Sequence, residues 1–522
     1  MAFLAAIEVD QRQRIVTSVD KLKEMLGGSW AIEETKSFAS ETLKASGNKV
    51  QPIRAASGDI WIRADKLADL EACLWEFRKE IVDEFRLPCS FAVVDEGANP
   101  AEARDRLQRK IRQVKDGKAG EMGHVSLPWL APCRIQPEKY SNHWRNKPDH
   151  QNQQRKLISA DSNARLKRGR KTLRNYYKQF PIIQERRMKE PESLGEFAPQ
   201  RDDSYLAVIR LDADNASHLF KNIPLGSKPE YESWKPLLEC SEAFGNCLTD
   251  AMKTAFRETV VKAAESGLLD KDKTVPISPL IAAGDDFLIV TRKELAMPFT
   301  LCLMSKYREL AANDKILKRH RKEDDPPLTL SGSILYARAG FPFSVLSELS
   351  VEVEQSAKKL RKSTGITDPC LDVYWLESTG RESAISSRDA QLSYKIGETI
   401  YSLNTRPWTL TQAIAMHKAA AQIGDIPRGK WHQLLEGLWQ GKPVGRFHYG
   451  RWLHHLSGQQ RNRMSEATKL LTECGKALWN DSDAPWVEAY SPPRLITPLL
   501  ELHQLHEMAG GIDIEPPEPE TR

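Results

Sequence analysis

Three aspartates in two separated stretches of the chain are candidates for binding a divalent cation. Asp212 ends the apolar run YLAVIRLD, and Asp285 and Asp286 are adjacent in the turn of IAAGDDFL. Carboxylates that meet at one point repel each other unless a cation lies between them, and their hard oxygen ligands select Mg²⁺ or Mn²⁺. Two such ions on a triphosphate would polarise its α-phosphate and activate a 3′-hydroxyl for in-line attack. This layout is typical of palm-type nucleotidyl transferases and nucleotide cyclases.

Groups that could hold the phosphates accompany these aspartates. Gly284 precedes the aspartate pair, and a glycine there lets the backbone approach a phosphate closely. Lys358, Lys359 and Arg361 follow on a predicted helix, and their charges could neutralise a phosphate. We therefore predict Gly284, Lys358 and Lys359 as nucleotide-binding residues.

The elements that must position these residues occur twice in the chain. Each copy has an apolar strand ending in aspartate, a helical stretch, two strands joined by a Gly-Asp turn, a further strand and a charged helix. Elements that recur in order indicate an internal repeat, and this pattern predicts a ferredoxin-like βαββαβ arrangement whose strand order periodicity cannot fix. The first copy has FLAAIEVD (3–10), AASGDIWI (55–62), CSFAVVDE (89–96) and a helix at 100–116; the second has YLAVIRLD (205–212), IAAGDDFL (281–288), LTLSGSILYA (328–337) and a helix at 343–363.

The first copy has fewer candidate ligands than the second. When the copies are aligned by the aspartates of their strands and turns, the first keeps Asp10 and Asp59. In that alignment Arg12 takes the place of Asp214, and Ile60 takes the place of the last aspartate of the hairpin. We therefore expect a degenerate first palm that serves as a structural or nucleotide-holding partner.

The predicted fold class is α+β, with two ferredoxin-like palm domains and an α-helical C-terminal domain. We place a first palm-like domain at 1–125, a basic connector at 126–200, a second palm with the GDD hairpin at 201–380, and a helical domain with a disordered tail at 381–522. Apolar residues at three- and four-residue spacing indicate the helices of the last domain. Six tryptophans of this domain are predicted to be core or interface anchors: Trp408, Trp431, Trp439, Trp452, Trp479 and Trp486.

Composition restricts the class of protein further. No apolar run approaches the length of a membrane span, and the opening MAFLAAIEVDQRQR lacks the features of a secretory signal, so we expect a cytoplasmic protein that does not bind membranes. The eight cysteines form no CxxC pair, which indicates reduced and mostly buried thiols. His454 and His455 have no partner at ligand spacing and are predicted to be a surface pair.

The net charge of +5 is unevenly distributed. Between Asn142 and Lys178 there are eleven Lys or Arg against two Asp, including RLKRGRK at 165–171, together with Trp144 and two tyrosines. A basic stretch with aromatic residues can follow a phosphate backbone, and we predict contact with nucleic acid here. A solvated linker that happens to be basic is the alternative.

As a set, these motifs resemble the large subunit of type III CRISPR effector complexes, the Cas10 family of Cmr2 and Csm1 types. The resemblance to the second palm and the start of the helical domain rests on five stretches, and 3–29 resembles the opening of the first palm. The five stretches are YLAVIRLDADNASHLF (205–220), AAGDDFLIV (282–290), LSGSILYARAGFPFSVLSELSVEVEQSAKKL (330–360), CLDVYWLE (370–377) and TRPWTL (405–410).

The resemblance implies a cyclic oligoadenylate synthase that acts in antiviral defence. ATP would be the substrate and Mg²⁺ or Mn²⁺ the cofactor, and binding of target RNA would open the site. Asp212 and Asp285 would be the principal metal ligands and catalytic residues, assisted by Asp286 and the carbonyl of Ala213. The implied partners are guide RNA and target RNA, held through other effector subunits, and the small and repeat-associated Cas subunits.

The sequence departs from the family pattern in three ways. It begins at the first palm without a histidine–aspartate nuclease domain, so we expect no DNA cleavage. The paired cysteines of the family's zinc ribbon are missing, and the connector holds only Cys133. The usual GGDD is AGDD, with Ala283 at the first glycine, and the extra methyl group could crowd a triphosphate.

Other interpretations of the same residues remain open. The chain could be a catalytically inactive palm scaffold of an RNA-guided complex, or a module that binds ATP without turnover. It could also be a stand-alone nucleotide cyclase, although such proteins usually carry one palm. Locally, Asp214 or Asn215 could simply cap the following helix.

Overall fold

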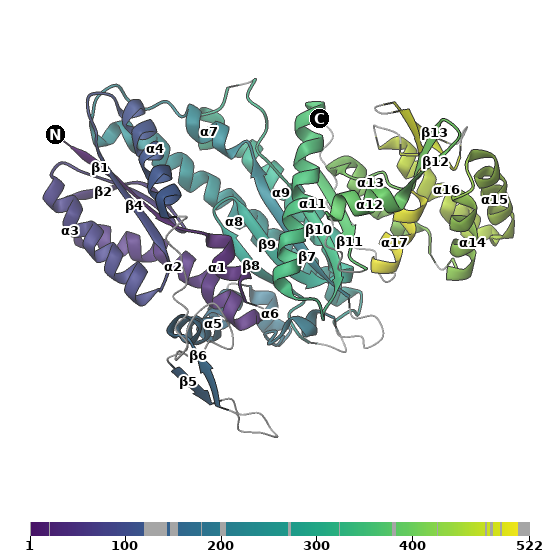
Figure 1. Cartoon of the computed structure of the whole chain (residues 1–522), viewed down its shortest axis with the longest axis horizontal. Coiled ribbons are helices and arrows are strands. Elements are labelled where there is room, and N and C mark those ends of the chain that lie inside the picture. Colours follow the sequence, from purple (N-terminus) through teal and green to yellow (C-terminus); the bar gives the residue numbers. More distant parts are fainter. Residues whose placement is uncertain are drawn as a thin grey trace.

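Figure 1 shows the computed structural model of the 522-residue chain. The structure describes residues 2–118 apart from 20 and 48, then 143–146, 155–198 apart from 179, and 205–509 apart from 270–272, 323, 378–382, 425, 475–477, 481–483 and 491–492. The elements form two palms side by side and a C-terminal part beyond the second palm (Figure 1).

The first palm (residues 3–118) is built on a four-stranded sheet in the order β2-β3-β1-β4, in which every neighbouring pair is antiparallel. Helices α1 and α2 follow the first strand, α3 and the π-helix η1 follow the hairpin, and α4 follows the last strand. The bounds are β1 Phe3–Val9, α1 Arg12–Thr17, α2 Leu22–Ala45, β2 Val50–Ala56, β3 Asp59–Ala64, α3 Leu67–Arg78, η1 Lys79–Glu84, β4 Cys89–Asp95 and α4 Pro100–Lys118.

The second palm (residues 205–375) repeats this arrangement within a larger sheet of order β14-β11-β10-β7-β9-β8. Its four strands β10-β7-β9-β8 take the positions of β4-β1-β3-β2, so the ferredoxin-like prediction is confirmed for both copies. The bounds are β7 Tyr205–Asp214, α7 Ala216–Asn222, η3 Tyr231–Trp234, α8 Lys235–Glu265, β8 Ile277–Ala283, β9 Asp286–Arg292, α9 Lys293–Asn313, α10 Lys315–Arg319, β10 Thr329–Arg338, α11 Phe343–Thr364, β11 Cys370–Trp375 and β14 Trp408–Thr409.

The two palms pack against each other reciprocally. Helix α2 of the first palm contacts β8 of the second, and the equivalent helix α8 of the second palm contacts β2 of the first. Such an exchange of equivalent contacts is the geometry of a two-fold interface, here formed within one chain. It places the hairpins β2–β3 and β8–β9 at the boundary between the palms.

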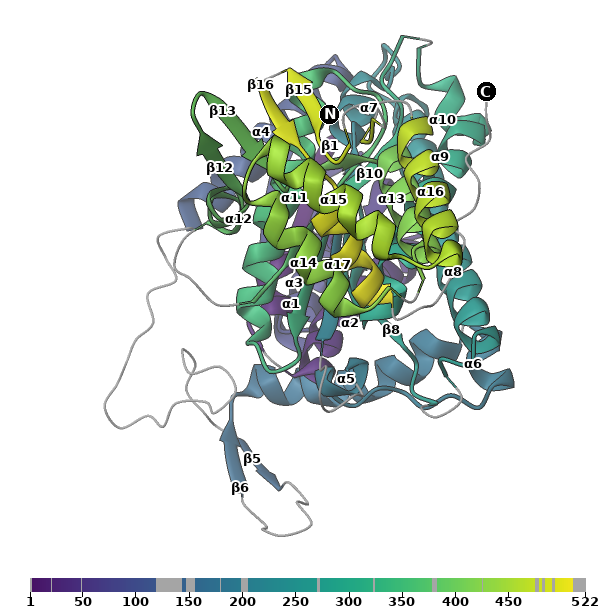
Figure 2. The same cartoon turned by 90° about the vertical axis from the view of Figure 1, so that its right-hand side faces the viewer.

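Between the palms, α5 (Ala160–Lys178) lies against α2, and the strands β5 (His143–Asn146) and β6 (Arg155–Ile158) pair as a hairpin that projects away from the body (Figure 2). A Cβ on Gly27 would lie 1.9 Å from the carbonyl oxygen of Arg165, so the helices cross where a side chain has no room. The short α6 (Pro181–Glu185) and the 3₁₀ helix η2 (Leu194–Phe197) complete this part.

Two arginines of the basic stretch make contacts within the fold, and contact of this stretch with nucleic acid stays a prediction. Arg165 is buried and donates to the carbonyl oxygen of Ile15 at 2.8 Å. Arg168 lies over the ring of Phe85 and donates to the carbonyl oxygen of Glu84 at 2.7 Å. Residues 119–142, which include Cys133, lie outside the described residues.

The C-terminal part is mainly helical, as predicted, but it also contains a four-stranded sheet of order β12-β13-β16-β15 that the sequence patterns do not indicate. Five of the six tryptophans are buried, and Trp439 is 40 % exposed. The predicted tail lies outside the described residues. The bounds are α12 Ala384–Leu392, β12 Ser393–Ile396, β13 Thr399–Ser402, α13 Leu410–Gln422, α14 Arg428–Leu438, α15 Lys442–His455, α16 Gly458–Glu473, β15 Val487–Tyr490, β16 Pro493–Ile496 and α17 Leu499–Ala509.

Two predictions from composition can be compared with the described residues. All seven cysteines of the described residues are buried thiols, as expected. None of its helices is both long enough and apolar enough to cross a membrane.

Candidate functional site

The structure brings the three predicted aspartates together at one end of β7 and β9. Asp212 lies directly opposite Asp286 in the antiparallel pair of these strands. The backbone N–H of Ala213 donates to the carbonyl oxygen of Asp285 at 3.1 Å, which ties the strand to the hairpin turn. All three aspartates are half-buried. The predicted convergence of two separated stretches is therefore present.

Lys358 lies between Asp212 and a further acid, Glu354. Its ammonium group forms an ion pair with Asp212 and a second one with Glu354 at 2.8 Å. Glu354 also binds Arg210, whose Nε lies 2.6 Å from Oε2. Helix α11 thus presents a cation to the carboxylate that the sequence singles out as a metal ligand.

The pKa values of Asp212 and Lys358 reflect these local charges. Burial raises the pKa of Asp212 to about 7; Lys358 opposes this rise, while Asp285 and Asp286 add to it by repulsion. Burial alone would lower the pKa of Lys358, but the carboxylates of Glu354 and Asp212 outweigh burial and raise it. The site therefore gathers more negative charge than one ammonium group fully balances.

The donor chemistry of the site suits a hard divalent cation. Carboxylate oxygens are the ligands that Mg²⁺ and Mn²⁺ prefer, and a cation among these aspartates would relieve the repulsion that raises the pKa of Asp212. Among the described residues, no three His, Cys, Asp or Glu side chains are already arranged as a metal-binding cluster. Binding of a cation would accordingly need Lys358 to give up part of its contact with Asp212.

Asp214 has a structural environment of its own. It is buried and accepts hydrogen bonds from Thr329 at 2.8 Å and from Ser331 at 2.6 Å, and Arg361 lies 3.4 Å away. The N-cap of α7 is Asn215, which makes no side-chain capping bond. Asn215 therefore occupies the N-cap position without a capping bond from its side chain, whereas Asp214 pairs with Arg361 and does not cap the helix.

The remaining predicted residues differ in their placement. Gly284 is the first residue of the β8–β9 turn and has a φ of +72°, a left-handed conformation that favours glycine. Lys359 is exposed, about 100° around α11 from Lys358, and does not point to the aspartates as Lys358 does. A role of Lys359 in nucleotide binding stays a prediction.

The strand registers correct the alignment of the two copies. Glu8 lies opposite Asp59 on β1 and β3, as Asp212 lies opposite Asp286 on β7 and β9. Glu8, and not Asp10, is therefore the counterpart of Asp212. The repeat is offset by two residues from the alignment that the terminal aspartates suggested.

The same offset holds for the following residues. Asp10 accepts from Ser90 at 2.9 Å, as Asp214 accepts from Ser331 at 2.6 Å, so these two aspartates correspond. Arg12 is consequently not a replaced carboxylate. Each copy then starts its next helix after a residue in the left-handed conformation, Gln11 with φ 51° and Asn215 with φ 63°.

The hairpins also correspond residue by residue, and again with a shift. Both carry a register irregularity next to a proline, Pro52 in β2 and Pro279 in β8. Counting from these prolines, Asp59 matches Asp286, and Gly58 matches Asp285. The pairing of Ile60 with Asp286 was wrong, and the first copy lacks one of four acidic positions rather than half of them.

The first palm also has a lysine equivalent to Lys358. Lys115 of α4 forms an ion pair with Glu8, as Lys358 of α11 does with Asp212. Sequence reasoning missed Glu8 and Lys115. The spacing that could have revealed Glu8 is acid–x–acid, which occurs as Glu8-Val9-Asp10 and again at Asp212.

A cavity of about 380 Å³ lies between the palms, and both hairpin turns reach it. Ser57 and Asp59 line it from the first palm, and Gly284 and Asp285 line it from the second. Helices α1, α2 and α4 of the first palm, α7 and α8 of the second, and residues of β2, β8 and β9 form the rest of its wall. The volume falls within the range of small-molecule sites, about 300–1,000 Å³.

The first palm makes direct contact with the carboxylates of the second. Gln13, in the first turn of α1, donates from Nε2 to Oδ2 of Asp286 at 3.2 Å. Its neighbour Arg12 lines the cavity and donates to the carbonyl oxygen of Ser57 at 3.2 Å. No sequence pattern indicates these contacts, because they depend on how the two palms pack.

Fold and site together define a pair of palm domains of the nucleotidyl-cyclase kind. The family model described as Cas10/Cmr2, second palm domain, matches residues 205–366. Residues 205–366 of the chain therefore match that family's second palm domain, which supports the resemblance to a type III large subunit recognised from the sequence motifs.

The fold of the chain is similar to that of a solved structure. A Csm1-Csm4 cassette in complex with pppApA has a TM-score of 0.52 and 14 % identity over 98 % of this chain and 69 % of that one. A cassette with cA4 (TM-score 0.49) and Csm1 of T.onnurineus (0.46) each have 14 % identity over 98 % of this chain and 70 % of theirs. No curated protein matches the sequence.

Proposed function

We propose that this chain makes cyclic oligoadenylate second messengers from ATP when the assembled effector complex has bound target RNA. The observation that carries the proposal is the cavity between the palms, to which the second palm presents Gly284 and Asp285 beside the carboxylates of Asp212 and Asp286. The similar Csm1-Csm4 cassette was solved with pppApA, a linear adenylate. A cavity walled by two palms could hold the two nucleotides that such a reaction must join.

Different residues of the site would have different roles in this reaction. Asp212 and Asp285 would hold Mg²⁺ or Mn²⁺ with help from Asp286 and the carbonyl of Ala213, and the bound metal would activate the 3′-hydroxyl and stabilise charge on the α-phosphate. Gly284 would allow phosphate to approach the turn. Lys358 would turn from Asp212 toward the triphosphate as the metal takes its place.

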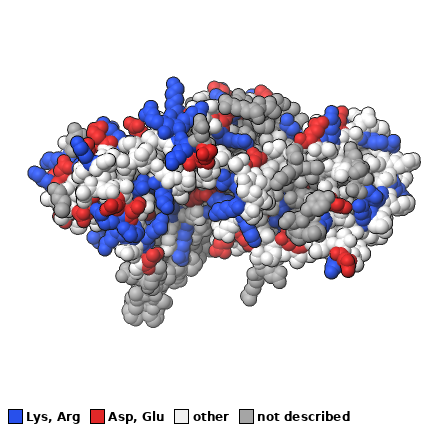
Figure 3. All heavy atoms as spheres, turned by 90° about the horizontal axis from the view of Figure 1, so that it is seen from above, with Lys and Arg blue, Asp and Glu red and all other residues white. Residues whose placement is uncertain are grey.

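Other subunits and RNA are part of the proposal. By analogy with the Csm1-Csm4 cassettes, we expect a further Cas subunit to bind this chain, and guide RNA and target RNA to act through such subunits. On the face seen in Figure 3, Lys and Arg side chains lie among Asp and Glu side chains.

An inactive palm scaffold is the second candidate, and the ion pair between Lys358 and Asp212 favours it, because it occupies a proposed metal ligand. Incubating the purified effector complex with ATP, Mn²⁺ and cognate target RNA separates the two. We expect cyclic oligoadenylates by mass spectrometry from the wild-type complex and none from the complex carrying Asp285→Asn and Asp286→Asn. Equal background from both complexes would establish the scaffold.

A further inference from the structure

We propose that Arg12 of the first palm binds the phosphate groups of a nucleotide held at the hairpin of the second palm. The inference rests on the proposed function, because it takes a nucleoside triphosphate as the ligand. It assigns a binding residue to the palm that the sequence marks as degenerate.

The position of Arg12 is the first argument. It is the first residue of α1, it is half-buried, and it lines the cavity opposite Gly284 and Asp285. A Cβ built on Gly284 would lie 3.7 Å from Nη1 of Arg12, so the guanidinium group lies next to the turn where phosphate is proposed to bind. Its hydrogen bond to Ser57 at 3.2 Å fixes it from the opposite turn.

The first hairpin leaves room for the side chain of Arg12 to extend to the second hairpin. Gly58 takes the place of Asp285 in the first palm, and a Cβ there would lie 3.1 Å from Cδ of Arg12. The aliphatic part of the arginine therefore occupies the space that a side chain at position 58 would need. The absence of a carboxylate at Gly58 is thus coupled to the presence of the arginine.

The two palms differ in charge at the start of the helix that follows their first strand. The registers that match Asp10 with Asp214 match Arg12 with Ala216, the first residue of α7, which also lines the cavity. The first palm therefore places a cation beside the second hairpin, whereas the equivalent residue of the second palm is an alanine.

The other cations of the cavity are less suited to this role. Arg54 forms an ion pair with Asp59 at 3.1 Å. Four more cavity-lining cations have exposed side chains: Lys36, Arg112, Lys221 and Lys253. Among the described residues, Arg12 donates one hydrogen bond, and a guanidinium group has five N–H donors in a planar fork that suits phosphate.

Calorimetric titration of the full chain with ATP and with adenosine, in Mn²⁺, tests the inference. We expect Arg12→Gln to weaken ATP binding by about tenfold or more, because a hydrogen bond to a charged group is lost, and to leave adenosine binding unchanged. Arg12→Lys should recover part of the loss. Arg14→Gln is the matched control, since Arg14 is exposed on the same helix, and it should bind ATP within about twofold of the wild type.

Each outcome decides something. Unchanged adenosine binding by Arg12→Gln shows that the cavity remains folded, so a loss confined to ATP supports the phosphate role. If Arg12→Gln binds ATP as tightly as the wild type does, the inference is overturned while the proposed function stands. If the wild-type chain binds no ATP at all, this inference fails, and the assay of the complex with target RNA decides the proposed function separately.

Discussion

Replacing Lys358 by methionine would remove the ammonium group between Asp212 and Glu354 and keep the length of the side chain. Loss of one partner of a fully buried ion pair destabilises a protein by about 3–5 kcal/mol. The side chains of Lys358 and Asp212 are 22 % and 23 % exposed, so solvent screens part of this effect. We expect the free energy of unfolding to fall by roughly 1–3 kcal/mol in the absence of divalent ions.

The same substitution removes the competitor of a metal ion. Mn²⁺ should therefore bind the variant more tightly than the wild type and stabilise it more. When the free ion is at a hundred times its dissociation constant from the variant, binding should raise the variant's free energy of unfolding by about 2.7 kcal/mol. Thermal unfolding in EDTA and in Mn²⁺ measures both effects. For a domain of 150–250 residues, 1 kcal/mol corresponds to a shift in Tm of about 2–4 °C.

Lys359→Met provides the control, because Lys359 carries the same charge on the exposed face of the same helix. It should change stability by no more than about 0.5 kcal/mol with or without Mn²⁺. Equal melting temperatures for the two variants in EDTA would refute the reasoning, since Lys358 would then contribute no more than a surface lysine does.

Two further predictions follow from the pKa of Asp212 and from the crossing of α2 and α5. The folded-state pKa of Asp212 is raised from 3.8 to about 7, so the contribution of this residue to stability falls as pH rises between these values. Because a metal binds the deprotonated carboxylate, the affinity for Mn²⁺ should rise by up to about tenfold per pH unit below pH 7 and level off above it. Titration of Mn²⁺ by electron paramagnetic resonance tests this, and a profile that Asp212→Asn leaves unchanged would contradict it. Gly27→Ala should lower stability by roughly 1–3 kcal/mol, because its Cβ would lie 1.9 Å from a backbone oxygen of α5. Gly117→Ala, in a helix with nothing within 4 Å, should be neutral or stabilising, and similar melting temperatures for the two glycine variants would count against the close crossing.

The sequence predicted which elements exist but not how their residues pair. Both first strands are nearly continuous apolar runs, buried on two faces, so they lack the alternation that would mark a register. Aligning them by the last aspartate was therefore arbitrary, and it hid Glu8. The two prolines that accompany the register shifts, Pro52 and Pro279, would have given the correct pairing of the hairpins.

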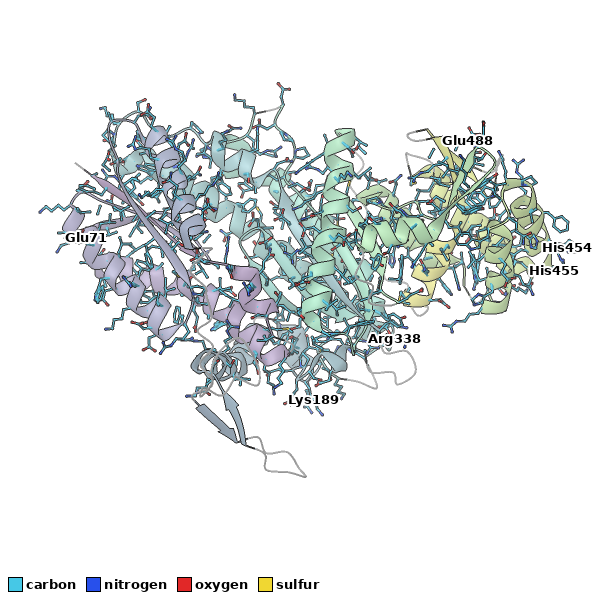
Figure 4. The ribbon with its side chains drawn as sticks, viewed as in Figure 1. Glu71, Lys189, Arg338, His454, His455 and Glu488 are labelled. Atoms are coloured by element: carbon cyan, nitrogen blue, oxygen red, sulfur yellow. The ribbon has the colours of Figure 1, made fainter. Side chains whose placement is uncertain are left out.

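Other features were missed because they depend on long-range contacts. Helix α9 is buried on almost all sides, so its sequence shows no amphipathic period and merges with the preceding strand β9. The sheet of the C-terminal part has strands of four residues, and β13 pairs with β16 across more than ninety residues of intervening chain. Local patterns carry little information about such pairs. The predicted surface pair His454 and His455 does lie at the outer end of this part (Figure 4).

The reciprocal packing of α2 on β8 and α8 on β2 has a consequence for how the two halves can differ. In a symmetric homodimer every substitution occurs twice, so neither subunit can gain an arginine or lose a carboxylate alone. Joining both halves in one polypeptide removes that restriction. In this chain one palm can therefore specialise as the main site and the other as its accessory. Two identical subunits could specialise in this way only by breaking their symmetry.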